Sequence, residues 1–72
     1  MVDIEEFYEK ISNDLDIQFK VEFDENFLKN PNWDSLLNMG LIAHLDREYS
    51  ITIDFDNLND HNTITKLYNL VK

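Results

Sequence analysis

Hydrophobic side chains recur at helical spacing in two well-separated stretches of the chain. In the first they are Ile4, Phe7, Tyr8, Ile11 and Leu15. In the second they are Ile64, Leu67, Tyr68 and Val71. Steps of three and four residues place each set on one face of a helix and leave the charged side chains on the other. The pattern therefore predicts amphipathic helices over residues 3–15 and 63–71.

A further helix is predicted over residues 34–49, because Asp34 is a favourable N-cap residue. The side chains expected to face the core are Leu41, Ile42, Leu45 and Tyr49. At about 100° per residue, a second set is expected to point toward solvent and partners: Leu36, Leu37, Gly40, His44 and Arg47. The glycine costs about 1 kcal/mol relative to alanine inside a helix, so it is either tolerated or marks the close approach of another backbone.

Two other stretches alternate between apolar and polar residues, which is the period of a half-buried strand. The apolar positions are Ile17, Phe19, Val21 and Phe23 in one stretch, and Tyr49, Ile51, Ile53 and Phe55 in the other. The segment 30–32 (Asn-Pro-Asn) indicates a turn, and an Asp- and Asn-rich segment over 54–62 is anchored by Leu58. The pattern alone therefore allows an α+β fold as well as an all-helical one.

Composition and charge narrow the class of protein. The 72 residues, 43% of them hydrophobic, allow one small domain over residues 1–72 and no second one. Six basic and fifteen acidic residues give a net charge of −9. Phosphate contacts need lysine and arginine, so this charge argues against nucleic-acid and anionic-membrane partners. It favours partner proteins with basic surfaces.

Several kinds of site are not expected. The chain has no cysteine, and therefore no disulfide and no thiolate metal site. An EF-hand loop counted from Asp54 would need glycine where Asn59 stands. Neither histidine has a metal-binding partner at helical spacing. We therefore expect no metal ion. We also expect no catalytic activity, because so small a domain offers little concave pocket in which to shift the pKa values of its carboxylates. The sequence shows no signal-peptide pattern and no apolar run long enough to cross a membrane. We expect a freestanding cytoplasmic monomer.

The segment Trp33-Asp34-Ser35-Leu36 carries the clearest chemical signal. A serine directly after a helix cap lies in the first turn, close to backbone N–H groups that have no partner within the helix. These donors and the helix dipole favour an anion, so a phosphate joined to Ser35 would be stabilised there.

The surroundings of this segment closely resemble the acyl carrier protein family, whose members bind phosphopantetheine. In that family Asp-Ser-Leu opens the second helix, and a Leu-acid-x-Glu-aromatic-x-Ile-x-Ile pattern closes it. Here these patterns are residues 34–36 and 45–53, and residues 62–67 resemble the opening of the family's last helix. The resemblance covers essentially the whole chain. It implies an all-α fold, a four-helix bundle with a short third helix at 55–60 and a long first loop packed over the core.

The resemblance also implies a function. Ser35 would accept 4′-phosphopantetheine from coenzyme A through a phosphopantetheinyl transferase, and Asp34 would cap the helix and help to orient that transfer. An acyl or aminoacyl cargo would be held as a thioester. Acyl or aminoacyl ligases and downstream transferases with basic docking surfaces would be the partners. Leu36 would supply the apolar contact that these partners use.

Departures from the family pattern favour a specialised pathway, such as surface polysaccharide or natural-product synthesis, over bulk fatty acid synthesis. Leu37, Gly40 and Arg47 stand where acidic residues are common, and Trp33 stands where a small residue is frequent.

Two other interpretations of the function remain open. The chain could be an unmodified interaction module of the same fold that docks a basic partner, or an acidic inhibitor that mimics nucleic acid.

Overall fold

The computed structural model describes residues 2–72, and every regular element in that range is helical. The elements in chain order are α1 (Ile4–Leu15), η1 (Phe27–Lys29), α2 (Ser35–Tyr49), α3 (Phe55–Leu58), η2 (Asn59–His61) and α4 (Ile64–Val71). The all-helical prediction is confirmed, and the α+β alternative is wrong for the described residues. The predicted short helix over 55–60 is α3 followed directly by the 3₁₀ turn η2.

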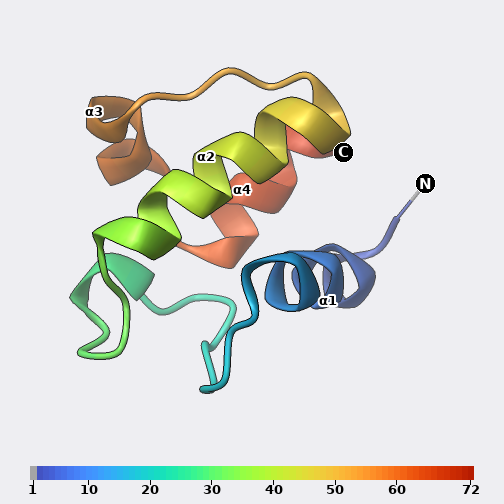
Figure 1. Ribbon diagram of the computed structural model, residues 1–72. Coiled ribbons are helices and arrows are strands. Elements are labelled where there is room, and N and C mark those ends of the chain that lie inside the picture. Colours follow the sequence, from blue (N-terminus) through green and yellow to red (C-terminus); the bar gives the residue numbers. More distant parts are fainter. Residues whose placement is uncertain (1) are drawn as a thin grey trace.

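Helix α1 packs against both α2 and α4 (Figure 1). The short α3 is followed by η2, which contacts α4 and leads to its first residue. The core between these helices is apolar and closely filled. Phe7 of α1 is fully buried, and its ring centroid lies 5.7 Å from that of Tyr49 and 5.6 Å from that of Tyr68. One aromatic side chain therefore joins α1, α2 and α4. The buried hydrophobic residues are Phe7, Ile11, Val21, Phe27, Trp33, Leu41, Leu45, Ile53, Leu58, Ile64 and Leu67.

All four α-helices begin at a side-chain cap. The cap residues are Asp3, Asp34, Asp54 and Thr63, and in each the side-chain oxygen accepts a hydrogen bond from the backbone N–H three residues later. Such caps satisfy backbone N–H donors that the helix itself leaves unpaired. Each cap stabilises the folded protein by about 1 kcal/mol. They explain why the helices start where they do, and in particular why α2 starts at Ser35.

The long connection between α1 and α2 alternates as a strand would, yet it pairs with no strand. Its backbone polar groups bond instead to the segment that precedes and opens α4. Phe27 N–H donates to the Asn62 carbonyl at 3.1 Å, and the Phe23 carbonyl accepts from the Thr65 N–H at 3.0 Å. Val21 and Phe27 fill the core beneath. The alternation therefore reflects an extended segment with one face on a helical bundle.

Two helices end in the left-handed conformation without glycine. Asp16 after α1 has φ 54°, and Ser50 after α2 has φ 56°. The Ser50 N–H donates to the Asp46 carbonyl at 3.0 Å, which closes the last turn of α2. A Cβ atom is unfavourable in this region of backbone space, so both positions carry strain that glycine would not.

Ser50→Gly should therefore raise the free energy of unfolding by roughly 0.5–1 kcal/mol, measured by urea denaturation. The gain is smaller than the full relief of strain because glycine also raises the conformational entropy of the unfolded chain. Ser50→Ala keeps the Cβ atom and should not stabilise the protein. Equal stability of the glycine and alanine variants would show that the left-handed turn is unstrained.

Candidate functional site: the start of α2

Ser35 is the first residue of α2, and its side chain is exposed. The preceding Asp34 is in extended conformation, and its Oδ1 accepts from the Leu37 N–H at 2.9 Å. Its carbonyl accepts from the Asn38 N–H at 3.1 Å. The Asp34 carboxylate is thus turned onto the helix end, which leaves the Ser35 hydroxyl accessible beside the positive end of the dipole.

Trp33 is the residue before the Asp34 cap, and its side chain is anchored in the core. It is only 8% exposed, and its ring lies 4.6 Å from that of Phe27, centroid to centroid. The indole N–H donates to Asn38 Oδ1 at 2.6 Å, and the Trp33 backbone N–H donates to the Asn30 carbonyl at 2.9 Å. Trp33 is therefore bound both to the core and to the first turn of α2. The sequence flagged Trp33 as unusual but did not predict this anchoring role.

The residues expected to face partners divide into exposed and covered ones. Leu36 is 75% exposed, and the Arg47 side chain is 54% exposed. Leu37 packs partly against the core. Gly40 is covered by the side chain of Leu15, and an added Cβ would lie 3.2 Å from its Cγ. The close neighbour is thus a side chain of α1 and not another backbone.

The prediction that His44 points outward is wrong, because its side chain is only 2% exposed. The cause is that α1 covers a flank of α2 that the helical wheel left to solvent. Met39, which the sequence analysis did not select, is instead 58% exposed on α2. The outer face beside Ser35 is therefore apolar, with Leu36 and Met39 as its most exposed large side chains.

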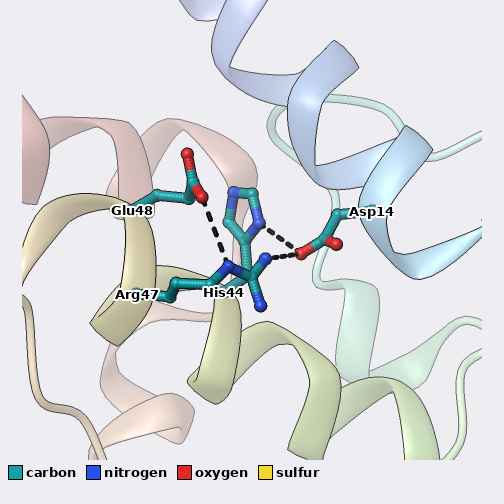
Figure 2. A network of polar contacts seen from close by, with 4 residues as sticks. All are labelled: Asp14, His44, Arg47 and Glu48. Atoms are coloured by element: carbon teal, nitrogen blue, oxygen red, sulfur yellow. Dashed lines mark hydrogen bonds and ion pairs between the residues drawn. The ribbon is translucent and has the colours of Figure 1, made fainter.

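His44 and Arg47 of α2 converge on Asp14 of α1 (Figure 2). His44 Nδ1 lies 2.7 Å from Asp14 Oδ2, and Arg47 donates to the same oxygen. Arg47 also donates to Glu48 at 3.3 Å. An ionised carboxylate only accepts hydrogen bonds, so the Nδ1 atom of His44 carries a proton. No sequence pattern could reveal this cluster, because Asp14 and His44 meet only when α1 packs on α2.

The contacts between Asp14 and Arg47 shift the pKa of both groups, and the pKa of the neighbouring Tyr49 is also shifted. The hydrogen bond from His44, followed by that from Arg47, holds the pKa of Asp14 below its usual value. The Asp14 hydrogen bond, followed by the one to Glu48, raises the pKa of Arg47. Burial, followed by the charge of Glu48, raises the pKa of the Tyr49 hydroxyl. Among residues 2–72, neither that hydroxyl nor His44 Nε2 has a hydrogen-bond partner.

Asp14→Asn should lower the thermal midpoint at pH 7 relative to the native chain. Because the folded-state pKa of Asp14 is lowered, its stabilisation is present above the ordinary carboxyl pKa. It is lost as the pH falls through the lowered folded-state value. The gap between variant and native chain should therefore close in acid, below about pH 4, in melting curves recorded across pH.

Asp46→Asn is the matched control for Asp14→Asn. It removes the same charge from an exposed α2 position that makes no side-chain hydrogen bond or ion pair with residues 2–72. A pH-independent gap for Asp14→Asn, or an equal gap for the control, would contradict the role given to the cluster.

Comparison with known proteins identifies the family. The family model for the phosphopantetheine attachment site matches residues 5–71, so the chain belongs to that family. Searches of curated proteins and of solved structures found no match. Members of the family carry covalently attached 4′-phosphopantetheine, and this is the cofactor of the chain. Carrier domains interact with phosphopantetheinyl transferases and biosynthetic enzymes and are generally not catalytic themselves.

The residues at the start of α2 fit this cofactor. A phosphodiester needs an accessible hydroxyl and nearby hydrogen-bond donors, and the exposed Ser35 in the first turn of a 15-residue helix offers both. Within residues 2–72, no three histidine or carboxylate side chains gather as a metal site would require. In the same range no helix is both long and apolar enough to cross a membrane.

Proposed function

We propose that Ser35 is the residue that carries the phosphopantetheine arm, and that the protein holds acyl or aminoacyl cargo on it as a thioester. The observation that supports this most directly is the exposure of Ser35 at the first position of α2, directly after the Asp34 cap. The family match over residues 5–71 includes this position. The arm supplies the thiol, which the chain itself lacks because it has no cysteine.

The chain's own residues would hold the attachment point in place. Asp34 ends the extended segment and begins the helix, so the backbone of Ser35 has a fixed position. Trp33 ties this junction to the core through Phe27. The phosphate would lie near the free N–H groups of the first helical turn, where the dipole stabilises negative charge. The protein would thus present cargo from a rigid base while the arm itself moves.

We further propose that partner enzymes dock on the outer face of α2, through Leu36 and Met39 with Arg47 at the edge. Leu37 and Gly40 would contribute only their exposed edges, and the buried His44 is no longer a contact. Large exposed apolar side chains next to a reactive position are typical of docking surfaces. The first turn of α2 contains no acidic residue.

This apolar face supports a specialised pathway over bulk fatty acid synthesis. Arg47 is paired with Asp14 and Glu48, and the exposed side chains nearest Ser35, Leu36 and Met39, are uncharged. A partner for it would need apolar rather than basic side chains at the centre of contact. Loading of the holo-protein by a fatty-acid malonyl transferase as fast as that enzyme loads its own carrier would contradict this assignment.

Incubation with coenzyme A, Mg²⁺ and a promiscuous phosphopantetheinyl transferase should add one phosphopantetheine to the native chain and none to Ser35→Ala. The Asp34 cap remains in the variant, so its helicity by circular dichroism should be unchanged. Intact mass spectrometry measures the addition.

Ser12→Ala and Ser50→Ala are the matched controls, because Ser12, Ser35 and Ser50 are the only serines. Both should be modified as fully as the native chain. Modification of folded Ser35→Ala would place the arm elsewhere. No modification of the folded native chain, with the cognate transferase included, would favour an unmodified module that docks a basic partner.

Leu36→Ala should lower kcat/KM of the transferase for the apo-protein about fivefold, because a contact of roughly 1 kcal/mol is lost. Stability should not change, since Leu36 is 75% exposed. Leu70→Ala on α4, where the leucine is 39% exposed, is the matched control and should react like the native chain. Equal rates for both variants would exclude Leu36 from the docking surface.

A further inference from the structure

A groove of about 630 Å³ runs between α1 and the first part of the connection that follows it. Its apolar walls are Tyr8 of α1 and Phe23 of the connection, whose rings meet edge to face at 5.7 Å between centroids. Val21, only 3% exposed, adds a further apolar wall from the connection. The groove is therefore lined by packed hydrophobic groups rather than by loose loop atoms.

Acidic side chains surround these apolar walls. Glu5 and Glu9 line the groove from α1, and Glu22 and Asp24 line it from the connection. Lys20 also lines it, but its Nζ lies 3.3 Å from Glu22 and so offsets only one of these charges. The rim thus has a clear excess of negative charge over an aromatic wall.

We propose that this groove docks a basic amphipathic segment of a partner protein, with arginine or lysine side chains alternating with apolar ones. The apolar side chains would contact Tyr8 and Phe23, and the cations would pair with the carboxylates of the rim. Long basic side chains suit such a site because their stems are apolar and their charged ends can lie over an aromatic ring. Nucleic acid and anionic lipid would be repelled by the same carboxylates.

The groove is separate from the attachment site. The end of α1 lies beside α2, where Leu15 covers Gly40, whereas the groove is lined by α1 residues from Glu5 to Asn13. The lining residues do not include Ser35 or the outer face of α2. This docking surface therefore goes beyond the carrier function and does not depend on the modification of Ser35. A partner that engaged both surfaces would gain affinity through effective concentration, while each contact alone stayed weak.

The test is a titration of the isotopically labelled full chain with a six-residue peptide that alternates arginine and leucine, followed by amide chemical shifts. We expect shifts confined to residues that line the groove. Glu9→Gln combined with Asp24→Asn should weaken binding roughly fivefold. Neither carboxylate makes a side-chain hydrogen bond or ion pair within residues 2–72, so the double variant should stay folded.

A matched double variant separates the groove from the general charge of the protein. Asp56→Asn with Asp60→Asn removes the same two charges at α3 and η2, on the opposite side of the view in Figure 1, and should bind as the native chain does. A peptide with serine in place of leucine should bind much more weakly. Equal losses in both double variants, equal binding of both peptides, or shifts centred on α2 would each overturn the proposal.

Discussion

The packing of Trp33 against Phe27 is the contact on which the position of Ser35 depends. Phe27 is fully buried, and the connection that contains it has no regular structure longer than the three residues of η1. Hydrogen bonds to the segment around Asn62 and Thr65 hold this connection against α4. A protein of 72 residues has few apolar side chains to spare, so its longest connection must supply part of the core. The start of α2 is thereby joined to the core two residues before Ser35.

The outer face of α2 and the groove beside Tyr8 differ in the charge that they expose. Asp14 is paired with His44 and Arg47, and the large exposed side chains near the start of α2 are the apolar Leu36 and Met39. Free carboxylates gather instead on α1 and on the connection that follows it, around the groove beside Tyr8. The net charge of −9 therefore says little about which contacts the start of α2 can make. The first surface suits apolar contacts and the second suits cations, so one small domain can present two kinds of recognition.

Local patterns predicted the helices well, because caps and apolar spacing act within a few residues of sequence. The position of Ser35 followed from the same local logic. The alternation around Phe19 could not separate a strand from an extended segment on a helical bundle, since both place every second side chain inside; the family resemblance resolved it. The predicted outward orientation of His44 was wrong for a different reason. Helix α2 is covered on a flank as well as on its inner face, and only the tertiary contact with Asp14 makes a buried imidazole acceptable.

Trp33 is the only tryptophan in the chain, and it lies two residues before Ser35 with its indole N–H bonded to Asn38. The indole fluorescence therefore comes from one place, the junction between the core and α2. The polarity around an indole sets its emission, so loosening of this junction would alter the spectrum without any added dye. The packing that positions Ser35 thus also gives the protein a built-in optical reporter of changes at the start of α2.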